Sequence, residues 1–133
     1  MMKNTNTILW VDDDADDLQL MQEILAKKKK EYKVVEAHNG REALVHLDTA
    51  KQKDELPCLI ILDINMPILD GKETLAIIKA HEVYKSIPVV VFTTSESELD
   101  KKYCRRYATE MVTKPPTFNT LGSALEKLLK LCK

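Results

Sequence analysis

The sequence predicts an α/β fold in which five parallel strands form one doubly wound sheet with helices on both faces. Apolar runs of strand length recur five times, at Ile8–Val11, Tyr32–Ala37, Cys58–Leu62, Val89–Phe92 and, more weakly, Met111–Thr113. Three of these runs are nearly continuous Ile, Leu and Val, which is typical of parallel strands that are buried on both faces. The segments between the runs have apolar residues at helical spacing, so strands and helices alternate along the chain.

Each intervening segment is predicted to form one helix. Their apolar positions are Leu18, Met21, Ile24 and Leu25, then Ala43, Leu44 and Leu47, and then Leu75 and Ile78. Asn39 and Ser95 are predicted helix N-caps, with Glu98 completing a capping box. Right-handed crossovers between successive strands predict a (βα)5 arrangement with the flavodoxin-like strand order 2-1-3-4-5. A functional site is then expected at the carboxyl ends of the strands.

Length and charge limit the possible functions. The chain has 133 residues, of which 44% are hydrophobic, so we expect a single domain over residues 1–133 with a core at about 7–132. A formal net charge of -1 provides no global field that attracts nucleic acid or an anionic membrane, so no direct DNA binding is expected. No apolar stretch approaches the roughly 18 residues that cross a bilayer, so no membrane association is expected.

The three cysteines do not suggest a disulfide framework or a metal site. Cys58, Cys104 and Cys132 are odd in number and widely spaced. This usage, with no apolar signal segment before the first strand, favours a reducing compartment, and we expect the protein to be cytoplasmic.

A cluster of acids directly follows the first predicted strand. Asp12, Asp13 and Asp14 are adjacent, and like charges at this spacing are costly unless solvent or a cation screens them. A hard divalent cation with oxygen ligands would do so. Alternatively, these acids, together with Asp16 and Asp17, only cap and start a helix. The cluster alone does not separate the two interpretations.

Four more polar residues follow the later strands. Asp63 ends the third strand, and Asn65, two residues on, could offer its main-chain carbonyl to a cation. Thr93 closes the fourth strand, where its hydroxyl could donate to a phosphoryl oxygen. Lys114 follows the fifth strand, and the Lys114–Pro115 bond is a candidate cis peptide that would direct the ammonium inward. Parallel strands place all these ends at one edge of the sheet.

These residues resemble the signature of two-component response-regulator receiver domains, in particular of stand-alone, chemotaxis-regulator-like ones. The resemblance rests on Val11-Asp12-Asp13, Leu62-Asp63-Ile64-Asn65-Met66-Pro67, Thr93 and Lys114-Pro115, and covers about residues 7–132. It implies that Asp63 is the phosphoacceptor and that Thr93 and Lys114 contact the phosphoryl group. It also implies a magnesium site formed by Asp13, Asp12 acting through water, the Asn65 carbonyl and Asp63.

The resemblance further implies partners and a switch. The phosphoryl donor would be a sensor histidine kinase or a histidine phosphotransfer protein, and an unknown downstream protein would read the phosphorylated state. In the family an aromatic residue three positions before the lysine turns inward, but here that position is Met111, which is flexible and cannot present the hydroxyl and flat ring of the usual tyrosine. Tyr103 and Tyr107 are interpreted as helix packing. Leu131 could mark a partner contact, with a homodimer through the Ser95–Lys133 surface as one form of it.

Three other functions compete with this interpretation. A haloacid-dehalogenase-type phosphatase also uses an aspartate nucleophile, a lysine and magnesium, but its nucleophile follows the first strand and its acidic pair comes late. A flavodoxin-like cofactor binder needs a phosphate-cradling loop after the first strand, where three aspartates would repel phosphate. A degenerate receiver that serves only as an interaction module is favoured by Met111 and opposed by the intact acidic and basic set.

Overall fold

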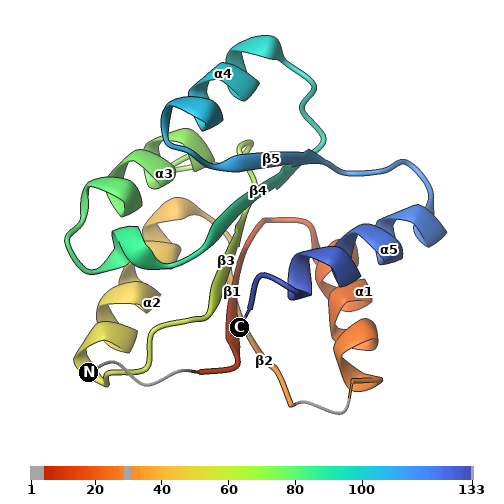
Figure 1. Ribbon diagram of the computed structural model, residues 1–133, viewed down its shortest axis with the longest axis horizontal. Helices are drawn as coiled ribbons and strands as arrows, with labels where there is room; N and C mark the ends of the chain where they lie inside the picture. The colour runs from red at the N-terminus through yellow and green to blue at the C-terminus, as the bar shows by residue number, and fades with distance from the viewer. Residues whose placement is uncertain (1–4, 29–30, 133) are drawn as a thin grey trace.

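Five parallel strands form one sheet in the order β2-β1-β3-β4-β5, as the sequence predicts. The computed structural model describes residues 5–28 and 31–132. The strands are β1 (Thr7–Val11), β2 (Lys33–Ala37), β3 (Leu59–Leu62), β4 (Val89–Thr93) and β5 (Glu110–Thr113). The helices are α1 (Ala15–Ala26), α2 (Gly40–Gln52), α3 (Gly71–Ala80), the 3-10 turn η1 (Tyr84–Ser86), α4 (Glu98–Arg106) and α5 (Phe118–Leu129). Figure 1 shows this alternation of strands and helices.

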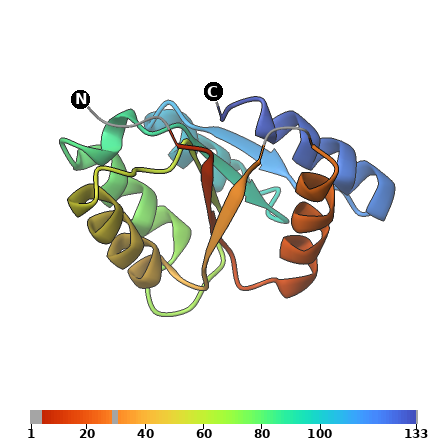
Figure 2. The same cartoon turned by 90° about the horizontal axis from the view of Figure 1, so that it is seen from below.

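Helices cover both faces of the sheet. Figure 2 shows α1 and α5 on one side and α2 and α3 on the other. Side chains of β1 alternate between the two layers, because successive residues of a strand point to opposite faces. Ile8 and Trp10 pack with α1 and α5, whereas Leu9 and Val11 pack with α2 and α3. The central strands therefore have no polar face, which explains their continuous apolar sequence.

The ends of the elements differ slightly from the sequence-based expectation. Asn39 caps α2 as predicted, and its side-chain oxygen accepts from the backbone N–H of Glu42 at 2.9 Å. The prediction that Ser95 caps the next helix is wrong, because α4 begins at Glu98 and its N-cap is Ser97. Ser95 instead donates its hydroxyl to the carboxylate of Asp100 at 2.5 Å.

The Lys114–Pro115 bond is trans, since no cis peptide occurs among the described residues. The hypothesis of a cis bond is therefore wrong. The backbone N–H of Lys114 continues the pairing of β5 with β4, donating to the Thr93 carbonyl at 2.7 Å. The long side chain then reaches the interior without a change of peptide geometry.

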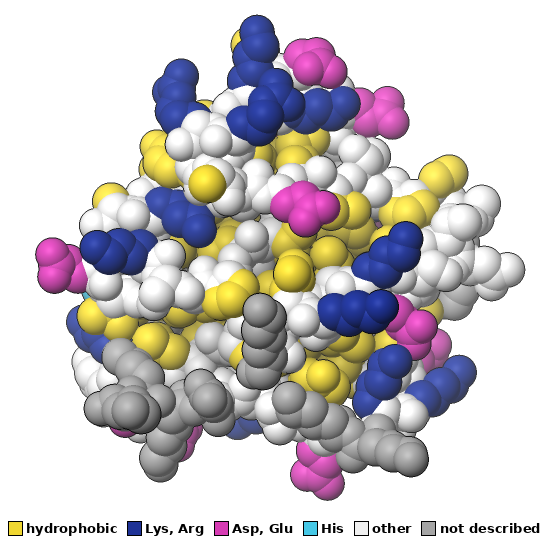
Figure 3. All heavy atoms as spheres, in the orientation of Figure 1, with side chains coloured by type: hydrophobic (Ala, Val, Ile, Leu, Met, Phe, Trp, Pro, Cys, Tyr) yellow, Lys and Arg dark blue, Asp and Glu magenta, His cyan; other side chains and the backbone are white. Residues whose placement is uncertain are grey.

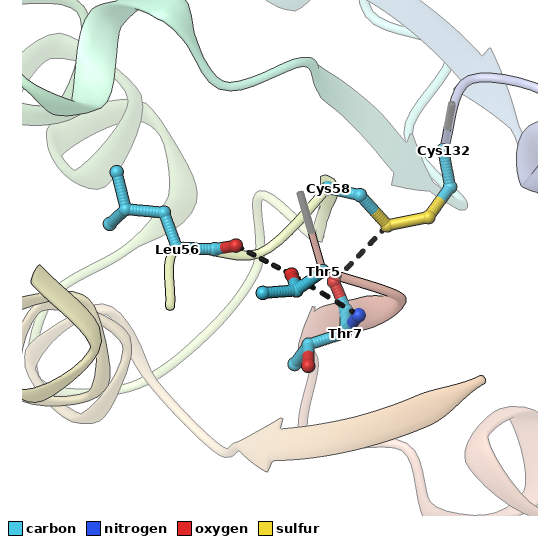
Figure 4. The surroundings of a disulfide bond; sticks show 5 residues. All are labelled: Thr5, Thr7, Leu56, Cys58 and Cys132. Carbon is cyan, nitrogen blue, oxygen red and sulfur yellow. Dashed lines mark hydrogen bonds between the residues drawn. A yellow bond between two sulfur atoms is a disulfide. The ribbon is translucent and has the colours of Figure 1, made fainter. Parts of the chain in front are cut away.

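A disulfide joins Cys58, directly before β3, to Cys132, just after α5 (Figure 4). The Cα atoms are 4.9 Å apart although 74 positions separate the two residues in sequence. This pairing differs from the free thiols expected for a reducing compartment. Cys58 Sγ also lies 3.3 Å from the Thr7 carbonyl oxygen. A reduced Cys58 thiol could donate to this oxygen, so the site accommodates both redox forms.

The remaining sequence expectations concern the membrane and the C-terminal helix. No helix within residues 5–28 and 31–132 is long and apolar enough to cross a membrane. Leu131 is half-buried and packs against the core beneath α5, so it does not stand out as an exposed contact residue. Lys133, the last residue of the expected dimer surface, lies outside the described residues.

Candidate functional site

Three aspartates converge where β1 and β3 end. Asp12 follows β1 and is 3% exposed, while Asp63 follows β3 and is 8% exposed. Asp13 is exposed beside them. One carboxylate oxygen from each of the three lies within 4.8 Å of the others. This set of three close oxygen ligands suits a hard divalent cation such as Mg²⁺, Mn²⁺ or Ca²⁺.

Strand pairing and a close helix position Asp63. Its backbone N–H donates to the Val11 carbonyl at 2.9 Å, and its own Oδ1 accepts from the backbone N–H of Ile64 at 2.7 Å. The first residue of α3, Gly71, packs directly against this main chain. A Cβ at Gly71 would lie 2.0 Å from the Asp63 carbonyl oxygen, so only glycine allows the helix to start here.

Lys114 reaches the same acidic group from the end of β5. Its ammonium nitrogen lies 2.6 Å from Asp12 Oδ2, 2.8 Å from Asp17 Oδ2 and 3.8 Å from Asp63 Oδ2. The Lys114 side chain is only 7% exposed. A buried ammonium with three carboxylates around it neutralises part of their charge, which lets them remain close together.

The burial of this group shifts two pKa values. Burial raises the pKa of Asp12 from 3.8 to about 6, against the opposing effect of the hydrogen bond and charge of Lys114. For Lys114, burial favours the neutral form, but its close contacts with the carboxylates of Asp12 and Asp17 and the charges of Asp12 and Asp63 outweigh this effect and raise its pKa. The lysine therefore stays protonated at neutral pH.

Thr93 and Asn65 complete the set predicted from the sequence. Thr93 ends β4, is fully buried, and its hydroxyl oxygen accepts from the backbone N–H of Ser95 at 3.3 Å. Asn65 is exposed in the loop between β3 and α3, where it lines an open hollow of about 560 Å³ together with Asp13. The structure thus brings Asp12, Asp63 and Lys114 into close contact, with the exposed side chains of Asp13 and Asn65 at the rim.

Asp17 is the residue of this group that the sequence interpretation missed. The sequence pattern places Asp17 only at the start of a helix, but its carboxylate is buried against Lys114. A signal was available in the helical spacing: Asp17, Met21 and Leu25 recur every four residues, so Asp17 lies on the face of α1 that packs on the sheet. An acid on a core-facing stripe calls for a buried partner.

Next to the site, an ion pair and a hydrogen bond connect α4 to the start of α3. The carboxylate of Asp100 forms an ion pair with Lys72 and accepts from Ser95, and these two contacts lower the pKa of Asp100. The Tyr103 hydroxyl donates to the Lys72 carbonyl at 2.6 Å. Tyr103 and Tyr107 pack on the same core as Met111, which confirms their interpretation as packing residues. Figure 3 shows Lys and Arg side chains gathered on the surface over α4.

A match to a family model establishes the class of protein to which this chain belongs. Residues 8–126 match the response regulator receiver domain. This range contains every residue of the site. The chain belongs to the response-regulator receiver family. The haloacid-dehalogenase and cofactor-binding alternatives are thereby excluded, and the resemblance inferred from the aspartates, threonine and lysine is confirmed.

Individual relatives agree with the receiver assignment. The response regulator Rcp1 of a Synechocystis species is 39% identical over 95 residues, which are 70% of this chain and 65% of Rcp1. Protein PilG of Pseudomonas aeruginosa is 36% identical over 119 residues, covering 89% of this chain and 84% of PilG.

Solved structures show the same fold. The phosphorylated cyanobacterial phytochrome response regulator RcpA is 32% identical, with a TM-score of 0.89, and the match covers 96% of this receiver domain and 94% of RcpA. The Mn²⁺-bound form of Rcp1 is also 32% identical, with a TM-score of 0.84 and 91% and 89% of the two chains covered.

Proposed function

We propose that this receiver domain accepts a phosphoryl group on Asp63 from a phosphohistidine of a sensor histidine kinase or a histidine phosphotransfer protein. The observation that carries the proposal is the convergence of Asp12, Asp13, Asp63 and Lys114 at one edge of the sheet. A nucleophilic carboxylate, two further acids and a buried ammonium provide positioning and charge neutralisation, which are the main requirements of phosphoryl transfer.

In this reaction an oxygen of the Asp63 carboxylate attacks the phosphorus of the donor. The new P–O bond forms as the P–N bond to the imidazole breaks, and the imidazole leaves with the bonding electron pair. Lys114 is close enough to Asp63 to neutralise negative charge on the transferring group. The Thr93 hydroxyl oxygen accepts from the Ser95 amide, and its own O–H remains able to donate to a phosphoryl oxygen.

The same acids support a magnesium site. Asp13, Asp12 acting through water, Asp63 and the Asn65 carbonyl would hold the ion. The exposure of Asp13 and Asn65 suits an ion that keeps several waters. When bound, Mg²⁺ supplies positive charge to the phosphoryl oxygens and thereby lowers the repulsion between donor and acceptor. The related response regulator Rcp1 has been solved in a Mn²⁺-bound form, which supports a divalent cation in general.

Incubation with phosphoramidate or acetyl phosphate and MgCl₂, followed by intact-mass measurement, tests the proposal. We expect one phosphoryl adduct on the wild-type protein and none on Asp63→Asn. Absence of an adduct under conditions that label another receiver domain would contradict the proposal and favour a degenerate receiver. Beryllofluoride binding, followed by NMR, gives an independent measurement.

The output of this domain is proposed to pass through protein contacts. RcpA, of which this chain covers 94%, supports action as a single-domain response regulator over residues 1–133. The basic side chains of α4, Lys101, Lys102, Arg105 and Arg106, would select a downstream protein by charge. A homodimer through the Ser95–Lys133 surface is the alternative, and sedimentation analysis with and without beryllofluoride distinguishes the two. We propose that this signalling takes place in the cytoplasm. We expect the receiver domain to bind neither DNA nor membranes directly.

A further inference from the structure

The side chain of Asp17 does not cap helix α1. Helix α1 is capped by Asp14, whose side chain accepts from the backbone N–H groups of Asp16 and Asp17. Asp16 already provides an exposed acid for the helix dipole. Asp17 is instead only 7% exposed, and burying a carboxylate is costly without a partner.

Lys114 is that partner. Asp17 Oδ2 lies 2.8 Å from Lys114 Nζ, but it has no aligned hydrogen bond to any group within the described part of the chain. The charge of Lys114 is therefore the main compensation for this buried oxygen. Removing the ammonium from Asp17 would leave a buried, uncompensated charge, which is strongly unfavourable.

The three distances around the ammonium show where Lys114 is held. It is in direct contact with Asp12 and Asp17, at 2.6 and 2.8 Å, and farther from the Asp63 carboxylate, at 3.8 Å. Asp17 lies on α1 and Asp63 after β3, so the lysine is drawn toward the α1 side of the site. A phosphoryl group on Asp63 would have to compete for this ammonium.

We propose that Asp17 is a positioning residue that restrains Lys114 in the unphosphorylated protein and thereby limits its contact with a phosphoryl group on Asp63. This inference rests on the proposed phosphorylation of Asp63. Loss of the Asp17 charge leaves Asp12 as the remaining direct contact of the ammonium, so the ammonium moves more readily to the phosphoryl group and stabilises the phosphorylated form. Asp17 thus sets the balance between the two states without touching the reacting atoms.

Asp17→Asn tests the restraint, because it keeps the shape of the side chain and removes its charge. Asp16→Asn is the matched control, since Asp16 is the adjacent acid of the same helical turn but is exposed, whereas the carboxylates around Lys114 are those of Asp12, Asp17 and Asp63. With MgCl₂ present, we expect Asp17→Asn to bind beryllofluoride about tenfold more tightly than wild type, the size of one charged contact. Asp16→Asn is expected to change the affinity little.

A second measurement separates restraint of the lysine from a general loss of negative charge. Hydrogen exchange of the Lys114 ammonium protons, followed by NMR in the metal-free protein, is expected to be faster in Asp17→Asn and unchanged in Asp16→Asn. Equal beryllofluoride affinities for the two variants, or unchanged exchange in Asp17→Asn, would overturn the inference. A wild-type protein that binds no beryllofluoride would instead contradict the proposed function itself.

Discussion

Reduction of the Cys58–Cys132 disulfide is expected to lower the free energy of unfolding by several kcal/mol. The bond closes a loop across 74 positions, and loop-closure entropy for this length corresponds to about 4.5 kcal/mol at room temperature. This value is an upper bound on the loss, because a reduced Cys58 thiol can donate a hydrogen bond to the nearby Thr7 carbonyl and so recover part of the stability. The disulfide lies away from the acidic site, so phosphoryl acceptance itself is expected to persist after reduction.

Urea unfolding with and without a phosphine reductant measures this effect. The oxidised protein is expected to unfold at a clearly higher urea concentration, and Cys132→Ser is expected to match the reduced protein under both conditions. Cys104→Ala is the control, because Cys104 is a buried free thiol and its loss should leave the difference between oxidised and reduced protein intact. Three titratable thiols in the unfolded, unreduced protein, or identical unfolding midpoints, would refute the reasoning.

Three further predictions concern backbone packing, metal binding and pH. A Cβ at Gly71 would lie 2.0 Å from a backbone oxygen, so Gly71→Ala is expected to lower the unfolding free energy by about 1–3 kcal/mol. A Cβ at Gly122 in α5 would lie 3.9 Å from Ile24 Cδ1, an ordinary contact, so Gly122→Ala is expected to raise the unfolding free energy by up to about 1 kcal/mol. Urea unfolding compares the two variants. Magnesium at 100 times its dissociation constant is expected to stabilise the protein by about 2.7 kcal/mol, measured as the shift of the unfolding transition. At the same magnesium concentration, the stabilisation is expected to be smaller in Asp13→Asn and equal to that of the wild type in Asp16→Asn. Hydrogen bonds that the His38 ring donates to the carboxylates of Glu36 and Glu42 raise the pKa of His38 above 6.5. Its contribution to stability is therefore fully present below pH 6.5 and lost as the pH rises through the folded pKa. His38→Gln should destabilise only on the acidic side of an unfolding pH profile, and by little because the ring is exposed.

Much of the fold could be predicted because its signals are local. The runs around β1, β3 and β4 are apolar over their whole length, which requires burial on both faces and so a parallel sheet with helices on each side. The weakest run, at Met111–Thr113, still forms β5 because β4 supplies a pairing partner. Helix boundaries were less certain, since Ser95 and Ser97 have similar capping chemistry and only the path of the loop selects Ser97.

The sequence by itself determined the strands, their order and the meeting of Asp12, Asp63 and Lys114, because in a parallel sheet every strand delivers its following residue to the same edge. Only the tertiary structure decided the pairing of Cys58 with Cys132 and the contact of Asp17 with Lys114. The disulfide depends on the approach of the chain after α5 to the start of β3, and the ion pair depends on the approach of α1 to the end of β5. No local sequence pattern encodes either distance. The lysine predicted to serve the phosphoryl group is, in the folded protein, in direct contact with Asp12 and also with Asp17, an acid that the sequence places only at a helix start.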